Sequence, residues 1–203
     1  MAAPLTASQL TDVRTRIRAV AERQIALHGP GAVSLRSIAV ELGWTAASLY
    51  RYYASKAELL DAVRTAAHER FSDCIEAAYA SSPDLWQRSR AIGDAYVAFA
   101  DEEPAAYQLI FAYEQEEAGK SEALLAAQQR SKASLTKYAR EMVSAGLLEG
   151  DADLIAHAWW ASLHGLIVLK MAGKLENSPD FDVLRHGLAR LIVRGARPDH
   201  DAP

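Results

Sequence analysis

Apolar residues recur every three or four positions along most of this chain, the spacing that places them on one face of an α-helix. Leu10, Val13, Ile17 and Val20 follow it in the first stretch, and the glycines and proline of residues 28–31 should end that helix. Strand-like alternation bounded by turn pairs such as Asn-Gly does not occur in the sequence. We therefore expect an all-α fold of about nine helices.

Start and stop signals divide the chain into short and long helices. Ser34 and Thr45 are placed as N-caps of two short helices, and Gly43 as the left-handed residue that ends the first. The S-K-A-E tetrapeptide at residues 55–58 has the pattern of a capping box and opens a long helix. Further helices are predicted at residues 84–100, from 104 onward, and at 122–145, 151–171 and 180–194, with a polar loop at 114–121.

Residues 34–53, SLRSIAVELGWTAASLYRYY, have the pattern of a helix-turn-helix, in which the second short helix enters the major groove of DNA. Ile38, Leu42, Trp44 and Leu49 would form the small core beneath the two helices. The other interpretation is a helical hairpin of a larger bundle with its tyrosines buried. The two interpretations differ in whether the second helix is exposed.

The outer face of that second helix carries residue types suited to DNA. Small residues at its start let the backbone approach base edges, hydroxyls can bind phosphates or bases, and an arginine can read guanine or pair with a phosphate. A lysine at the start of the next helix would bind phosphate, which a helix N-terminus already favours. The residues predicted to face DNA on these grounds are Thr45, Ala46, Ser48, Tyr50, Arg51, Tyr52 and Lys56.

Residues 31–63 are similar to the DNA-binding signature of the TetR/AcrR family. The similarity rests on the runs S-x-R-x-I-A, L-G, T-x-x-x-L-Y-x-Y-Y and S-K-x-x-L. The resemblance implies that Ala47 also faces DNA and that Arg36 reaches the groove or its wall. Trp44 and Tyr53 depart from the family pattern, which has a smaller apolar residue and a phenylalanine at these positions.

The C-terminal part resembles the WHG subgroup of the same family. Trp160, His164 and Gly165 match its W-x-x-x-H-G helix, and the run DEEPAAYQLIF matches its P-x-x-Y-x-L-x-F segment. Regulators of this type form two-fold dimers through their last two helices, which implies a homodimer through residues 151–171 and 180–194. The apolar residues of these helices could instead serve only the core of a single chain.

Charge is distributed unevenly along the chain. Residues 1–60 contain seven lysines and arginines against four acidic residues, and the remainder is acidic. A basic N-terminal part suits a polyanionic partner such as double-stranded DNA. We expect a three-helix DNA-binding domain at residues 1–56 and a helical bundle for ligand sensing and dimerisation at residues 57–203, with the division inside the helix that starts at Lys56.

Aromatic residues crowd the central part of the chain. Aromatics around a cavity with one or two polar tips are typical of small-molecule sites, although the same spacing is also typical of plain helix packing. His164 could likewise be a hydrogen-bonded packing residue beside Gly165. The predicted ligand-binding residues are Trp86, Tyr96, Phe99, Tyr107, Phe111, Met142, Trp160 and His164.

Other chemistry has weaker support in the sequence. Asp153, His157 and His164 could share a helix face that binds a metal, but they lack the fixed ligand set of a metal site. Cys74 could sense oxidation, but a lone buried thiol is usually inert. The sequence has no nucleophile-base pair, Glu-x-x-His repeat or phosphate-binding glycine loop, so we expect no enzyme, no metal site and no cofactor.

No apolar run approaches the roughly 20 residues that cross a bilayer, and the N-terminus does not resemble a signal peptide. We therefore expect a cytoplasmic protein without a membrane partner. Together the patterns predict a DNA-binding transcriptional regulator, a repressor that leaves its palindromic operator when a small apolar or aromatic ligand binds. The alternatives are a regulator that needs no ligand, a helical-bundle enzyme and a protein-interaction module.

Overall fold

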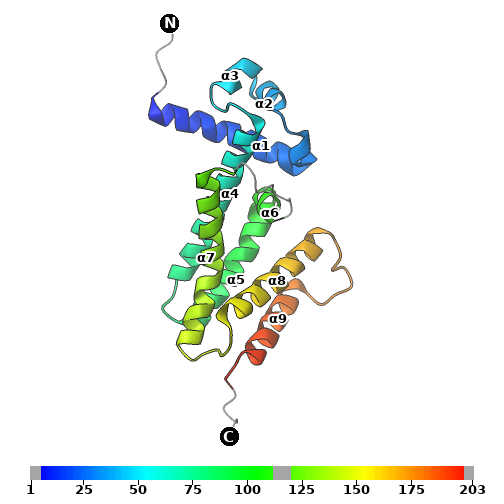
Figure 1. Ribbon diagram of the computed structural model, residues 1–203. Helices are drawn as coiled ribbons and strands as arrows, with labels where there is room; N and C mark the ends of the chain where they lie inside the picture. Colours follow the sequence, from blue (N-terminus) through cyan, green and yellow to red (C-terminus); the bar gives the residue numbers. More distant parts are fainter. Residues whose placement is uncertain (1–5, 112–119, 199–203) are drawn as a thin grey trace. The chain divides into compact units, whose positions relative to one another are not determined.

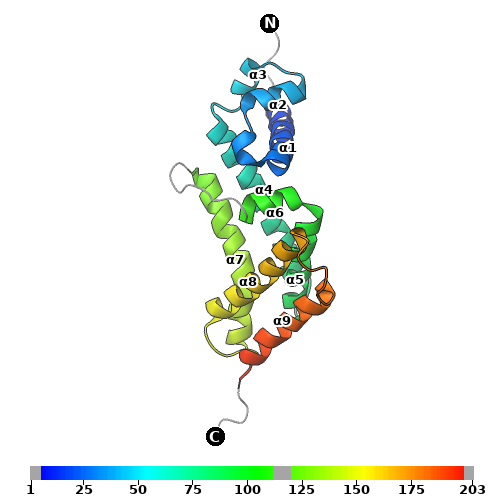
Figure 2. The same ribbon diagram turned by 90° about the vertical axis from the view of Figure 1, so that its right-hand side faces the viewer.

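The computed structural model describes residues 6–111 and 120–198, and the regular structure within these ranges is α-helical (Figure 1, Figure 2). Its helices are α1 (Ala7–Ala32), α2 (Leu35–Leu42), α3 (Ala46–Tyr50), α4 (Lys56–Ala80), α5 (Leu85–Glu102), α6 (Pro104–Phe111), α7 (Glu122–Ser144), α8 (Ala152–Met171) and α9 (Phe181–Gly195). The all-α prediction and the helix order are confirmed for these residues. Most of the loop expected at residues 114–121 lies outside them.

The chain forms two compact units, and three helices contribute to both. The first unit comprises Met1–Phe71 and Asp101–Gln128, and the second comprises Ser72–Ala100 and Gln129–Pro203. In the first half of the chain the two units divide between Phe71 and Ser72, within α4. The assignment of separate functions to residues 1–56 and 57–203 stays a prediction.

In the first unit, α1 loses its regular path at the glycine-proline run that the sequence marked as its end. Gly29 has φ 77° and ψ 162°, outside the helical region, so the residues from Pro30 to Ala32 form a separate turn. At the other end Thr6 caps the helix in a capping box with Gln9. The first regular part of α1 therefore ends at His28.

The core of the first unit gathers around α1, which packs on α2 and α6. Arg70 of α4 adds an ion-pair link to α1, because its Nη2 donates to Glu22 at 2.7 Å, and its Nε donates to Glu103, just before α6, at 2.6 Å. Burial raises the pKa of Glu22. The buried apolar residues here include Ile17, Ala21, Ile25, Ile38, Leu49, Leu59, Val63, Phe71, Tyr107 and Leu109.

In the second unit, the part of α4 from Ser72 onward and the part of α7 from Gln129 onward are joined by polar contacts as well as apolar ones. The buried hydroxyls of Ser72 and Ser131 are 3.0 Å apart, and the exposed guanidinium of Arg130 donates to Asp73 and Glu76 at 2.6 Å. α8 packs against α9. The buried apolar residues of this unit include Ile75, Ile92, Tyr96, Phe99, Tyr138, Ala139, Met142, Leu148, Ile155 and Ile167.

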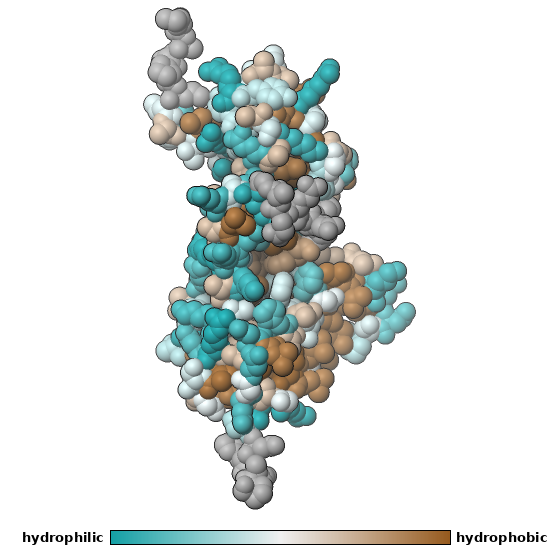
Figure 3. Space-filling model, viewed as in Figure 1, coloured by the Kyte–Doolittle hydropathy of each residue, from teal (hydrophilic) through white to brown (hydrophobic). Residues whose placement is uncertain are grey.

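α8 and α9 leave much apolar surface uncovered. No residue of α9 is buried in the single chain. Figure 3 shows apolar surface gathered over these two helices. The large apolar side chains exposed on them are Leu154, Val168, Leu169, Met171, Val183 and Leu191.

Candidate nucleic-acid interface and effector cavity

The turn between α2 and α3 is built as the sequence predicts. Ser34 caps α2, its Oγ accepting from the Ser37 N–H at 3.0 Å. Gly43 ends the helix with φ 71° and ψ 27°, the left-handed conformation that glycine adopts without strain. The Gly43 N–H donates to the Val40 carbonyl at 3.1 Å and the Trp44 N–H to the Ala39 carbonyl at 2.8 Å, which closes the turn.

α3 is a short helix held to the first unit by one fully buried side chain. Thr45 caps it, with Oγ1 accepting from the Ser48 N–H at 3.3 Å and lying 2.9 Å from the Ser48 hydroxyl. Leu49 has no exposed surface and anchors the helix to the core. The opposite side of the helix is therefore free to meet a partner.

The structure places all nine predicted DNA-facing residues outside the core. Arg36, Thr45, Ala47, Tyr50 and Arg51 are exposed, and Tyr50 shows 57% of its surface. The other members of the set are half-buried: Ala46, Ser48, Tyr52 and Lys56. The tyrosines at residues 50 and 52 are thus not buried as the helical-hairpin interpretation required.

Lys56 begins α4 beside the last turn of α1. Its Nζ donates to the Gly31 carbonyl at 2.9 Å, which fixes the ammonium group near the N-terminus of α4. Ser55 caps that helix by accepting from the Glu58 N–H at 3.1 Å, while the Glu58 carboxylate accepts from the Ala54 N–H at 2.6 Å. The predicted capping box is therefore present in a shifted form, because its returning bond reaches residue 54 and not residue 55.

Two arginines of α1 that are not among the predicted DNA-facing residues also reach this surface. The guanidinium of Arg16 lies 5.9 Å from the ring centre of Trp44, whose ring lies 6.1 Å from that of Tyr52. Arg14 Nη2 donates to the Tyr52 carbonyl at 3.4 Å. Arg14 and Arg16 are two of the seven basic residues counted at positions 1–60, and they lie three and four residues before the buried Ile17 and Val20, respectively.

Tyr53 behaves as a core residue with a polar end. It is 3% exposed, and the Arg14 guanidinium lies 5.8 Å from its ring centre. Burial raises the pKa of its hydroxyl. The tyrosine therefore fills the apolar place that the family pattern gives to phenylalanine, as a neutral side chain.

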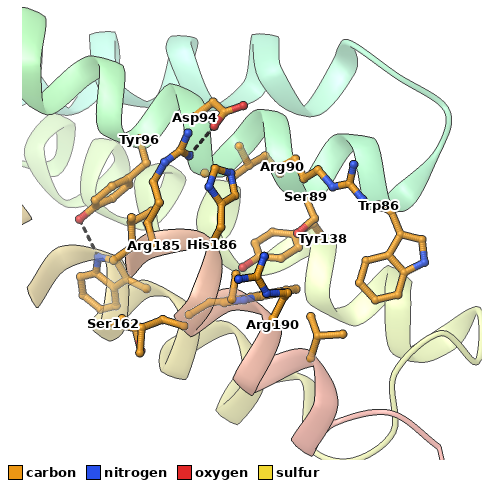
Figure 4. Close-up of a pocket in the computed structure, with 18 of the residues that line it drawn as sticks. Trp86, Ser89, Arg90, Asp94, Tyr96, Tyr138, Ser162, Arg185, His186 and Arg190 are labelled. Carbon is orange, nitrogen blue, oxygen red and sulfur yellow. Dashed lines mark hydrogen bonds and ion pairs between the residues drawn. The ribbon is translucent and has the colours of Figure 1, made fainter. Parts of the chain in front are cut away.

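A cavity of about 760 Å³ lies in the second unit among α5, α7, α8 and α9 (Figure 4). This volume is within the range of small-molecule sites in proteins. Of the predicted ligand-binding residues, Trp86, Tyr96 and Trp160 line it. Its further aromatic walls are Tyr138 and Trp159, whose ring centres are 5.2 Å apart.

A short hydrogen-bonded chain forms one wall of the cavity. Trp160 Nε1 donates to the Tyr96 hydroxyl at 2.9 Å, and that hydroxyl lies 3.4 Å from His164 Nδ1. Burial lowers the pKa of His164, so its neutral ring can accept a hydrogen bond from the Tyr96 hydroxyl. His164 does not itself line the cavity but orients the tyrosine that does.

The other predicted ligand-binding residues lie elsewhere. Phe99 and Met142 are buried in the core of the second unit and do not line the cavity. Tyr107 and Phe111 belong to the first unit, where Phe111 packs at 4.9 Å from Tyr107 and 5.5 Å from Phe71 between ring centres. These four side chains serve packing in this structure.

The weaker candidates have ordinary contacts. Asp153 accepts an ion-pair hydrogen bond from Arg140 at 2.7 Å, and His157 Nδ1 lies 2.6 Å from the Asp153 carbonyl oxygen. Among the described residues no three histidine, cysteine or acidic side chains group as a metal site would require. The half-buried Cys74 thiol lies 3.7 Å from the Ala95 carbonyl oxygen.

A helix-turn-helix with an outward recognition helix, joined in one chain to an all-α unit with a cavity, defines the class of DNA-binding regulators. Two family models match: residues 17–63 match bacterial regulatory proteins of the tetR family, and residues 89–193 match the tetracyclin repressor-like C-terminal domain. The chain belongs to the TetR family of transcriptional regulators.

Individual relatives agree with this assignment. An HTH-type transcriptional regulator of Mycobacterium tuberculosis is 31% identical over 101 residues, which cover 49% of this chain and 43% of that protein. The match thus spans less than half the length of this curated relative. The names of the families and of this relative describe a regulator and not an enzyme.

Solved structures extend the likeness over nearly the whole fold. A protein of unknown function from Rhodococcus sp. RHA1 is 26% identical, with 92% of this chain and 96% of that chain covered and a TM-score of 0.80. A bacterial regulatory protein in the tetR family from Rhodococcus RHA1 is 21% identical, with 91% and 96% covered and a TM-score of 0.71. The second likeness concerns the fold alone.

Proposed function

We propose that this chain is a dimeric repressor that binds a palindromic operator through α3 and releases it when a small molecule enters the cavity. The observation that carries the proposal is the outward face of α3. Leu49 alone anchors that helix fully in the core, while Thr45, Tyr50 and Arg51 face outward.

The side chains of α3 and of the residues that follow it can be assigned to DNA bases or to the DNA backbone. Ala46 and Ala47 allow close approach of the helix to base edges, and Arg51 can form two hydrogen bonds to a guanine. Tyr50, Tyr52 and other hydroxyl groups suit phosphate oxygens. Lys56, already held at the N-terminus of α4, adds a fixed positive charge where a phosphate is favoured.

Dimerisation through α8 and α9 accounts for the apolar surface of the second unit. Leu154 is 68% exposed and Leu191 is 63% exposed in the single chain. No apolar stretch long enough to cross a membrane was expected from the sequence, but α8 is long and apolar enough by composition. Only 22% of its most apolar window is buried within the single chain, so most of this apolar surface is uncovered. We assign that uncovered surface to a second copy, because a two-fold dimer also presents two α3 helices to a palindrome.

The helix α4 supports coupling between the cavity-bearing unit and the DNA-binding residues. It is continuous from Lys56 to Ala80 and belongs to both units. Its Arg70 is ion-paired to Glu22 of α1, so a shift of α4 acts on the helix that carries α2. A ligand that favours the shifted dimer by a few kcal/mol would empty the operator in the cytoplasm.

The test is binding to operator duplexes selected from random-sequence DNA, followed by fluorescence anisotropy at several salt concentrations. Arg51→Ala should cost about 1–3 kcal/mol and relax the preference at one base pair. Lys56→Ala should weaken binding to all sequences and reduce the salt slope by about one.

Lys132→Ala serves as the matched control, because this exposed lysine of α7 lies outside the set. Its affinity and salt slope should equal those of the unaltered protein. Unchanged operator affinity in both the Arg51 and Lys56 variants would refute the assignment of α3.

A further inference from the structure

The cavity of the second unit has more cationic than anionic lining, although the chain as a whole carries net charge −4. Four arginines and two aspartates contribute to its walls and rim. These residues are Asp84, Arg90, Asp94, Arg185, Arg190 and Arg197. The charge of the cavity is thus opposite in sign to that of the protein.

Part of this charge is neutralised within the protein. Arg185 forms an ion pair with Asp94 of α5 (Figure 4) and another with Asp182 at the start of its own helix. Its side chain is only 18% exposed, and the pKa of Asp182 is lowered by the hydrogen bond from this guanidinium. Arg185 therefore links α9 to α5, and its single positive charge is fully offset by the two carboxylates.

Three guanidinium groups at the cavity have no such partner. Within the residues that the structure describes, Arg90, Arg190 and Arg197 form no ion pair with an acidic side chain. The remaining aspartate, Asp84, accepts from the Gln87 N–H at 2.7 Å and so serves as a cap of α5. The unpaired charge at the cavity is therefore positive.

The three arginines come from different elements. Arg90 lies on α5, Arg190 on α9, and Arg197 follows α9. The segment after α9 is fixed by the backbone bond of 2.7 Å from the Glu149 N–H to the Ala196 carbonyl. An anion held by these groups would thus contact α5, the C-terminal half of α9 and the segment that follows α9.

The other walls favour an apolar or aromatic body. Trp86, Tyr138, Trp159 and Trp160 line the cavity, and burial raises the pKa of Tyr138 so that its hydroxyl stays neutral. Flat rings stack on such walls, and arginine also stacks on aromatic faces. One part of the cavity therefore suits a ring or hydrocarbon, and another suits an anionic group.

We propose that the effector is an amphipathic organic anion, with an aromatic or hydrocarbon body against the tryptophans and a carboxylate or similar group bound by Arg90, Arg190 and Arg197. This inference rests on the proposed function, because it names the class of ligand for the same cavity. It replaces the apolar ligand expected from the sequence with a negatively charged one. Guanidinium groups recognise carboxylates through strong, charge-assisted hydrogen bonds.

The test uses two fluorescent probes with the same ring skeleton, anilinonaphthalene sulfonate, which is an anion, and neutral phenyl-naphthylamine. Both are titrated into the full chain at low and at high salt. We expect the anion to bind at least about tenfold more tightly at low salt, and its advantage to shrink at high salt. Equal affinities, or tighter binding of the neutral probe, would overturn the proposal.

Variants of the cavity arginines identify which positive charges bind the anionic probe. The double variant Arg90→Gln/Arg190→Gln should weaken binding of the anion about tenfold and leave that of the neutral probe unchanged. Arg194→Gln is the matched control, since this arginine lies one turn further along α9 and does not line the cavity. The neutral probe also reports that each variant still has a formed cavity.

A double variant that binds the anion as tightly as the unaltered chain would refute the inference. Operator binding is measured separately on the same preparations, so the two proposals can fail independently. If the unaltered chain prefers the anionic probe but does not bind operator DNA, only the proposed regulatory function is refuted. If it binds operator DNA but shows no preference for the anionic probe, only the proposed class of ligand is refuted.

Discussion

Gly43 offers a direct test of how the turn before α3 is built. Its φ of 71° lies in the left-handed region, where a residue with a Cβ is less stable by roughly 1–2 kcal/mol. A Cβ added at this position would meet no atom within 4 Å. The cost of Gly43→Ala is therefore conformational only, and we expect about 1–2 kcal/mol of destabilisation.

The expected loss is large enough to measure by thermal unfolding. For a chain of this size, 1 kcal/mol shifts Tm by about 2–4 °C, so Gly43→Ala should lower Tm by about 2–8 °C in circular dichroism melts. Operator affinity should fall as well, because this turn sets the direction of α3. Gly43→Asn should lose less, since asparagine tolerates the left-handed conformation better than alanine.

Gly31→Ala is the matched control within the same unit. Gly31 also has no atom within 4 Å of an added Cβ, but its φ is not positive. This variant should keep or slightly raise Tm, because alanine restricts the unfolded chain more than glycine does. Equal Tm values for Gly43→Ala and Gly31→Ala, or a larger loss for Gly43→Asn than for Gly43→Ala, would contradict the reasoning.

Three further predictions concern the core, the dimer and pH. Met142 has no exposed surface, so Met142→Ala should lower the free energy of unfolding by about 2–5 kcal/mol in urea denaturation, and a loss under about 1 kcal/mol would contradict its place in the core. Leu191→Glu should leave the chain folded but monomeric by light scattering, whereas a persistent dimer would move the interface elsewhere. Burial, with the nearby Lys120, lowers the pKa of His68 from 6.5 to about 4. The unfolded chain therefore binds more protons between these values, and stability should fall as the pH drops through this window, by up to roughly 3 kcal/mol. His68→Gln should flatten this dependence, and an unchanged slope of unfolding free energy against pH would count against it.

The helix boundaries were predictable because they depend on local chemistry. Ser34, Thr45, Asp151 and Asp180 cap helices in the structure at or within a residue of the expected starts. Each cap joins a side-chain oxygen to a backbone N–H two or three residues away, so no distant part of the chain is needed to form it. The end of α2 at Gly43 was predictable for the same reason, because it depends on the conformation of that residue and on bonds to the preceding turn.

The cavity was only partly predictable because it depends on contacts between distant segments. Trp86, Tyr96 and Trp160 line it, but Phe99 and Met142 share the same apolar character and lie in the core. Helical spacing alone does not distinguish these two environments. The arginines of α9 carried no sequence signal, since charged residues on an amphipathic helix usually point to water.

The absence of buried residues in α9 has a consequence for the amount of protein in the cell. Under the proposed dimer, that helix gains further packing from a second subunit, so association adds to the stability of the folded chain. Dilution would dissociate the dimer and remove this contribution, so the melting temperature would rise with protein concentration. A cell making few copies would lose the regulator to proteolysis sooner than one making many.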